Sequence, residues 1–237
     1  MRDYILPLTN ERREFFSFLK QIKNRNMKKI LFPLLATAAI TAFFAFRPAE
    51  IETIAIGAKA PKTDLKMKAT LGKDVTLFDT KKDKGLLVVF SCNTCPFVVG
   101  GEDSEGWEGR YSELQKSCDS EGIGMILVNS NEAKRSKGDN LEDMTKRAKE
   151  HGFSSSIYAL DKNSELADAF GARTTPHVFL FDKDMKLVYK GAIDDNVDKA
   201  ASVSQPYLNN ALKNLGGGKA IEPAETRPVG CGIKRLS

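Results

Sequence analysis

An apolar run that stops at two closely spaced cysteines constrains this chain more than any other feature. Residues 86–101 read LLVVFSCNTCPFVVGG, so two residues separate Cys92 from Cys95 and Pro96 follows directly. Two thiols at this spacing suit a redox pair, half of a metal site or a structural disulfide. Other features of the sequence are needed to choose among these three kinds of site.

The cysteine count argues against a protein held together by disulfides. The 237-residue chain has four cysteines and 41% hydrophobic residues, which is enough to build a core without cross-links. The cysteine pair therefore needs a chemical explanation. The four are Cys92, Cys95, Cys118 and Cys231.

An apolar segment near the N-terminus predicts export. Residues 27–46, MKKILFPLLATAAITAFFAF, place two lysines before an apolar stretch that contains small residues, as secretory signals do. Without cleavage, residues 30–46 are just long enough to anchor the chain in a membrane. Since Met27 is the natural start for such a signal, we interpret residues 1–26 as an upstream misreading; the alternative is a cytoplasmic extension. We expect a periplasmic or secreted protein in an oxidising compartment.

The charge distribution gives no support for binding nucleic acid. The formal net charge is +5, and this excess lies within residues 1–46, so the remainder is neutral. We divide that remainder into a linker (47–60), one main domain (61–216) and a C-terminal tail (217–237).

The main domain alternates predicted strands and helices. Apolar runs at 85–91 and 123–131 predict strands covered on both faces. Hairpins are expected at 64–79 and 177–193, and a further strand at 154–161. Helices are expected at 107–118, 139–152, 163–172 and 204–218, with Asp139 or Asn140 as the cap of the second and Asn163 as the cap of the third. In the first helix Cys118 shares an apolar stripe with Trp107, so we predict that it is an inert buried thiol.

This order predicts an α/β domain with a mixed central sheet and helices on both faces, a thioredoxin-like layout. In such a fold a C-x-x-C pair lies where a strand leads into a helix. We expect Cys92 to be exposed and to attack as a thiolate, because a helix N-terminus favours the charged form. Cys95 would then resolve the mixed disulfide. The two glycines after residue 99 are expected to interrupt that helix, which would restart near Ser104.

A proline before a predicted strand also favours a thioredoxin-like layout. The segment ARTTPHVFLF places Pro176 directly before a predicted strand. We expect a cis peptide bond in a loop that faces the cysteines, with Thr175 offering backbone groups to an incoming extended chain. The alternative is an ordinary trans proline at the start of a strand.

Several segments together resemble a known family. They are IGAKAP, VVFSCNTCPF, LVNSN, FGARTTPHVFLFDKDMKLVYKGAIDDN and PAETRPVGCGIK. From about Gly57 to Lys234 the chain resembles the redoxin branch of the thioredoxin superfamily, in its peroxiredoxin-like group related to alkyl hydroperoxide reductase and thiol-specific antioxidant. The resemblance implies a thioredoxin-like fold and a thiol-based redox role. Neither Cys92 nor Cys95 ends the P-x-x-x-T-x-x-C pattern of true peroxiredoxins, so efficient peroxidase activity is not expected.

Three functions are compared. A thiol–disulfide oxidoreductase acting on protein dithiols and disulfides accounts for the cysteine pair, Pro176 and export together. The alternatives are a thiol peroxidase using the same cysteines and a metal or haem-assembly chaperone that adds His177 or Cys231 to them. The chain has only two histidines, so few side chains are available to complete a metal site with the cysteines. We therefore predict no cofactor and no metal.

Cys231 lies in the segment RPVGCGIK, beyond the last predicted helix. Pro228 and the flanking glycines suggest a defined turn, with Ile233 as a possible anchor on the domain. The resemblance, which includes this motif, suggests that the tail folds back and brings Cys231 to the pair as a third thiol. The alternatives are a structural thiol or a disulfide with Cys118.

Overall fold

The apolar run before the cysteine pair forms β3 (Gly85–Ser91), a strand inside a seven-stranded sheet. The computed structural model describes residues 52–236. Every side chain of β3 is buried, and successive side chains contribute to two different clusters, Leu87 and Val89 to one and Leu86, Val88 and Phe90 to the other. Since neighbouring side chains of a strand point to opposite faces, the sheet is covered on both sides, as predicted.

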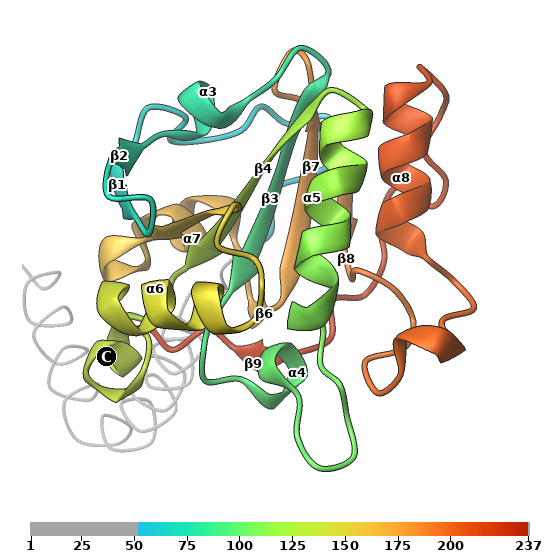
Figure 1. Cartoon of the computed structure of the whole chain (residues 1–237). Coiled ribbons are helices and arrows are strands. Elements are labelled where there is room, and N and C mark those ends of the chain that lie inside the picture. The colour runs from blue at the N-terminus through green and yellow to red at the C-terminus, as the bar shows by residue number, and fades with distance from the viewer. Residues whose placement is uncertain (1–51, 237) are drawn as a thin grey trace, which may run out of the picture. The chain divides into compact units, whose positions relative to one another are not determined.

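The sheet is mixed, with the strand order β2-β1-β5-β4-β3-β7-β8 (Figure 1). The β3–β4 and β4–β5 pairs are parallel, and the other pairs are antiparallel. The strands besides β3 are β1 (Met67–Ala69), β2 (Asp74–Val75), β4 (Ile123–Asn129), β5 (Ile157–Leu160), β7 (His177–Asp182) and β8 (Leu187–Gly191).

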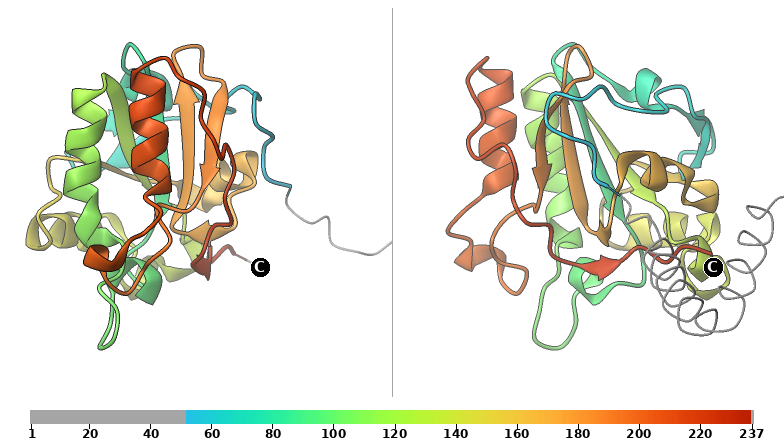
Figure 2. Two further views of the ribbon diagram at one scale, coloured as in Figure 1. Left: turned by 90° about the vertical axis from the view of Figure 1, so that its right-hand side faces the viewer. Right: turned by 180° about the vertical axis from the view of Figure 1, so that it is seen from behind.

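Helices cover both faces of the sheet. The buried side chains of α5, α6 and α8 join one cluster and those of α3 and α7 the other, and Figure 2 shows α5 and α8 side by side on their face. This is the predicted α/β architecture, a thioredoxin-like fold. The helices are α3 (Leu77–Thr80), α4 (Pro96–Val99), α5 (Tyr111–Ser120), α6 (Leu141–Glu150), α7 (Glu165–Phe170) and α8 (Tyr207–Gly216), with 3-10 turns at Glu108–Arg110, Glu132–Lys137, Lys162–Ser164 and Ala200–Ser202.

The hairpin predicted at 64–79 is only partly correct. β1 and β2 pair, but the chain then enters α3 instead of continuing as a strand. The Thr76 hydroxyl accepts a hydrogen bond from the N–H of Asp79 at 3.0 Å, which caps this helix. The local capping signal therefore outweighs the short alternating pattern.

The helix after Pro96 is interrupted at the two glycines, as predicted. α4 ends at Gly100, where φ is +80°, and a Cβ there would lie 2.7 Å from the carbonyl oxygen of Ser104. The returning loop is closed by a 2.7 Å bond from the N–H of Gly101 to that oxygen. Helical structure resumes at Glu108, so the predicted restart near Ser104 is wrong.

The helix caps were predicted with mixed success. Asn140, one of two candidates, caps α6 by accepting from the N–H of Asp143 at 2.9 Å. Asn163 does not cap α7, because it lies in the preceding 3-10 turn with a positive φ. The carboxylate of Asp161 accepts instead from the N–H groups of Leu166 and Ala167.

The C-terminal tail folds back along the domain, first beside β8 and then beside β6 (Thr174–Thr175) (Figure 2). The N–H of Thr226 bonds the carbonyl oxygen of Lys190 at 3.0 Å, and β9 (Cys231–Gly232) pairs antiparallel with β6. The predicted anchor Ile233 is 7% exposed. The tail thus returns to the end of the sheet where β3 leads into the cysteines.

The expectations for residues 1–26 and 27–46 concern positions outside the described residues. Within residues 52–236, no helix has the length and apolar character needed to cross a membrane.

Candidate active site

The structure brings the cysteine pair and the proline loop together. The Sγ of Cys92 lies 3.1 Å from the hydroxyl of Thr175, and the thiol of Cys95 donates to the carbonyl oxygen of Thr175 at 3.2 Å. The Thr175–Pro176 peptide bond is cis, so that prediction is confirmed. One residue before the proline therefore contacts both sulfur atoms.

Cys92 is not exposed, which corrects the sequence-based expectation. Cys92 and Cys95 are 1% and 2% exposed. β9 lies on the same β6 that contacts both sulfur atoms, and Cys231 packs against the cluster to which the pair belongs. The C-x-x-C motif alone does not predict that the pair is covered, because β9 lies far from the motif in the sequence.

Cys231 is placed next to the pair. It pairs with Thr175 in the β6–β9 ladder, and its interaction with Cys95 contributes to lowering the pKa of the Cys95 thiol. All four cysteines are free thiols in the structure. Cys118 is fully buried in α5, and burial raises the pKa of its thiol to about 12. The role of Cys231 as a third thiol stays a prediction.

The two active-site thiols differ in their electrostatic surroundings. The hydrogen bond from Cys92, followed by hydrogen bonds from Cys231 and Thr175, lowers the pKa of Cys95 to about 5 against the effect of burial. The hydrogen bond with Cys95 and then burial raise the pKa of Cys92, and the charge of Asp139 adds to the increase. These pKa shifts favour a thiolate at Cys95, whereas the sequence predicts one at Cys92.

The start of α4 contributes to this difference. The helix begins at Pro96, so its N-cap is Cys95, while Cys92 lies outside it. With only four residues, α4 has a small dipole, and the hydrogen-bond donors around Cys95 account for most of the stabilisation of its thiolate.

Sequence reasoning missed the polar side chains behind the cysteine loop. Asp139 was considered only as a helix cap, yet its carboxylate contacts both residues between the cysteines, Asn93 and Thr94. Asn129 and Asn131, from the segment LVNSN, bond the same carboxylate. These contacts join segments that are far apart in the sequence. The only local indication of them is that the polar residues of LVNSN directly follow a buried strand.

The histidines are engaged away from the cysteines. His177 is buried and its Nδ1 accepts from the N–H of Arg173 at 3.2 Å; burial lowers the pKa of its imidazole to about 3. His151 follows α6 and lies 3.1 Å from the carboxylate of Glu108. Among residues 52–236, no group of three or more histidine, cysteine or acidic side chains is arranged to hold a metal ion.

The fold that presents the cysteine pair and the cis-proline loop is thioredoxin-like. Residues 55–205 match the family model described as Redoxin, and the chain belongs to the redoxin family. Among curated proteins the comparison finds no match.

Two solved structures are similar to this chain over most of their length. The crystal structure of an uncharacterized conserved protein from Geobacillus kaustophilus is 29% identical with a TM-score of 0.69, and the match covers 78% of this chain and 94% of that one. The crystal structure of a hypothetical protein from Sinorhizobium meliloti 1021 is 28% identical with a TM-score of 0.69, covering 78% and 97%.

Proposed function

We propose that this redoxin is a thiol–disulfide oxidoreductase in which Cys92 and Cys95 alternate between dithiol and disulfide. The observation that carries the proposal is the contact of both sulfur atoms with Thr175, next to the cis bond to Pro176. Membership in the redoxin family supports a thiol-based redox role. Protein disulfides and dithiols are the proposed substrates.

Each step balances in atoms and electrons. The Cys95 thiolate attacks one sulfur of a partner disulfide, and the other partner sulfur leaves as a thiolate and takes up a proton. The thiol of Cys92 then loses its proton and attacks the Sγ of Cys95. This forms the Cys92–Cys95 disulfide and releases the first partner sulfur as a thiol. The reverse sequence oxidises a partner dithiol.

We propose a third-thiol role for Cys231. In the oxidised protein the deprotonated Cys231 would attack the Sγ of Cys95, the Cys92–Cys95 bond would break, and Cys92 would leave as a thiolate and accept a proton. The disulfide would then join Cys95 and Cys231 with no external oxidant. Cys231 pairs with Thr175, whose carbonyl oxygen accepts from the Cys95 thiol, and this shared neighbour supports the direction of attack.

The test of the main proposal is reduction of insulin disulfides with dithiothreitol as the electron source. We expect the wild-type protein to accelerate the reaction, and Cys95→Ser to abolish it. The double variant Cys92→Ser/Cys231→Ser should retain a partner through Cys95, because no thiol remains to resolve the mixed disulfide. If Cys95→Ser keeps the wild-type rate, the proposal is wrong. Consumption of hydrogen peroxide in preference to insulin disulfides would favour the thiol peroxidase alternative instead.

The third-thiol role is tested by mild oxidation of Cys92→Ser followed by peptide mapping. We expect a Cys95–Cys231 disulfide. Recovery of both peptides as free thiols, with the tail still docked, would contradict the role.

We also propose that the protein is exported and works in the periplasm or outside the cell. The apolar segment at 27–46, which follows the pattern of a secretory signal, supports this proposal. Fractionation of the native host, probed with an antibody to the main domain, tests it.

A further inference from the structure

A buried carboxylate behind the cysteine loop has no role in the steps above. Asp139 lies between the 3-10 turn Glu132–Lys137 and α6, and it is 0% exposed. Asn140 caps α6, so the Asp139 side chain is not needed for capping. A buried carboxylate is costly unless its oxygens accept several hydrogen bonds, so its partners indicate what it does.

Each of the two carboxylate oxygens of Asp139 accepts two hydrogen bonds. Oδ1 accepts from the N–H of Asn93 and from the amide of Asn129, each at 2.7 Å. Oδ2 accepts from the hydroxyl of Thr94 at 2.7 Å and from the amide of Asn131 at 3.2 Å. Asn93 and Thr94 are the two residues between the cysteines. The carboxylate therefore fixes the loop that sets the separation of Cys92 and Cys95.

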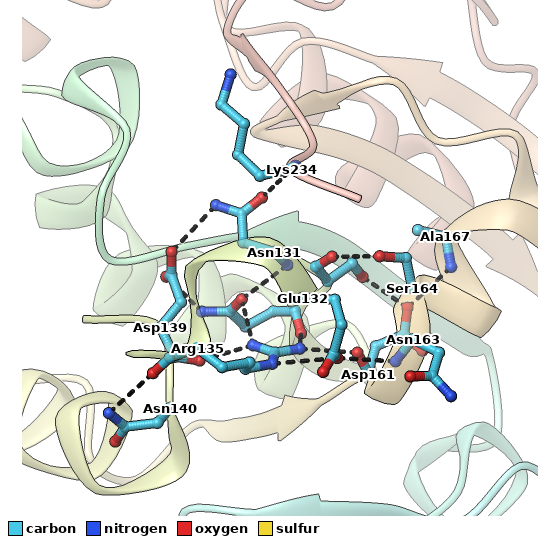
Figure 3. Close-up of polar contacts among 12 residues, drawn as sticks. Asn131, Glu132, Arg135, Asp139, Asn140, Asp161, Asn163, Ser164, Ala167 and Lys234 are labelled. Atoms are coloured by element: carbon cyan, nitrogen blue, oxygen red, sulfur yellow. Dashed lines mark hydrogen bonds and ion pairs between the residues drawn. The ribbon is translucent and has the colours of Figure 1, made fainter. Parts of the chain in front are cut away.

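The same carboxylate is linked to the tail. The Oδ1 of Asn131 accepts from the N–H of Lys234 at 2.9 Å, as Figure 3 shows, and the carbonyl oxygen of Lys234 accepts from the N–H of Ala133 at 2.9 Å. Lys234 is three residues beyond Cys231. Asp139 and Asn131 thus join the cysteine loop and the tail through consecutive hydrogen bonds.

Arg135 holds this group in place from the other side. Its guanidinium donates to the side-chain oxygen of Asn129 at 2.9 Å and to the carbonyl oxygen of Asp139 at 2.6 Å (Figure 3). It also bonds the carbonyl oxygen of Asp161 at 2.8 Å. A network whose polar groups are paired in this way is rigid and specifies one arrangement.

We propose that Asp139 is a positioning residue that holds the Asn93–Thr94 loop and, through Asn131, the tail, and so sets the redox equilibrium of the cysteine pair and the placement of Cys231. Its negative charge also acts on the pair, because it disfavours a thiolate at Cys92. Loss of that charge favours the reduced, partly ionised form over the disulfide. The inference rests on the proposed function, since it assumes that Cys92 and Cys95 form a disulfide.

The experiment is titration of the wild-type protein and Asp139→Asn against glutathione buffers. We expect the equilibrium constant to shift about tenfold toward the reduced form, which for a two-electron couple is about 30 mV. The matched control is Asp161→Asn, which removes another fully buried carboxylate with three hydrogen bonds, from Ser130, Leu166 and Ala167. Both variants should lose stability to urea, but only Asp139→Asn should shift the constant.

Two variants that disturb the structure less test the inference if Asp139→Asn does not fold. Thr94→Val removes one bond from an exposed side chain and should shift the constant, because the loop between the cysteines loses a contact with Asp139. Asn131→Ala should increase the alkylation rate of Cys231, because the tail loses the bond to Lys234.

The outcomes separate this inference from the proposed function. A wild-type protein that never forms the Cys92–Cys95 disulfide would defeat the function itself. A wild-type protein that forms it, with Asp139→Asn or Thr94→Val at the wild-type constant, would overturn the inference alone. An equal shift in Asp161→Asn would show a general effect of destabilisation and would also overturn it.

Discussion

At the scale of single residues, the two cysteines differ in their hydrogen-bond partners and in their position relative to α4. A C-x-x-C pattern alone favours the first cysteine as the thiolate, since it assumes that the helix starts there. Here Pro96 occupies the first position of α4, which leaves Cys95 as the N-cap and Cys92 outside the helix. Donors from three segments then converge on Cys95.

This difference predicts the pH dependence of the thiolate. In the reduced protein the ultraviolet absorption of a thiolate should persist as the pH falls and disappear with a midpoint near the pKa of about 5 for Cys95. Cys95→Ser should lack this transition. Cys92→Ala removes the largest stabilising hydrogen bond, so its midpoint should move up toward the ordinary value of about 8.5. An unchanged midpoint in Cys95→Ser would contradict the assignment.

The residues of the site were predictable to different degrees. Cys92, Cys95, Thr175 and Pro176 come from motifs with short spacing, and the structure does bring them together. The burial of Cys92 and the contacts of Asp139 depend on segments far away in the chain. No local pattern could indicate them.

At the scale of secondary-structure elements, long apolar patterns predicted the fold well and short ones did not. β3, β4 and the stripe of α5 contain runs of buried side chains that only a strand or a helix of that length explains. β9 has two residues and therefore no periodicity, and α3 depends on a single capping interaction. β9, which lies beside the active site, belongs to this second group.

The docking of β9 can be tested with two glycines of the tail. A Cβ on Gly230 would lie 2.3 Å from the carbonyl oxygen of Thr175, whereas the nearest atom to a Cβ on Gly232 is 4.0 Å away. Overpacking of this kind costs about 1–3 kcal/mol, so Gly230→Ala should release the tail and speed alkylation of Cys231 by about tenfold or more. The matched control Gly232→Ala should alkylate at the wild-type rate.

Equal alkylation rates in Gly230→Ala and the wild-type protein would show that β9 does not rest on β6 in solution. A rise in both glycine variants would point to a general loosening of the tail. The position of Cys231 beside the pair would then need another explanation.

At the scale of the whole molecule, the chain combines a redoxin domain with a C-terminal tail and, in its sequence, an apolar segment typical of an export signal. The tail returns to the active site, and all three thiols of that site lie at one end of the sheet. An exported dithiol would meet oxidising conditions, in which a third thiol next to the pair provides a second disulfide partner.

Export predicts the mass and redox state of the native protein. Protein purified from the envelope fraction of its host should lack the residues before about Arg47 if the signal is cleaved. It should also contain a fraction with a disulfide at Cys92 and Cys95. Intact mass with and without alkylation measures both. A protein that begins at Met1 and stays fully reduced in the cytosol would contradict export.

The central claim is that Cys92 and Cys95 form one redox pair, and a redox titration tests it most directly. The wild-type protein and Cys118→Ala, which changes a buried thiol away from the site, are equilibrated with graded glutathione buffers, and alkylated thiols are counted by mass. We expect a single two-electron transition at Cys92 and Cys95 in both proteins, and its loss in Cys92→Ser/Cys231→Ser and in Cys95→Ser. If both cysteines remain thiols across the whole range in the wild-type protein, the account is wrong.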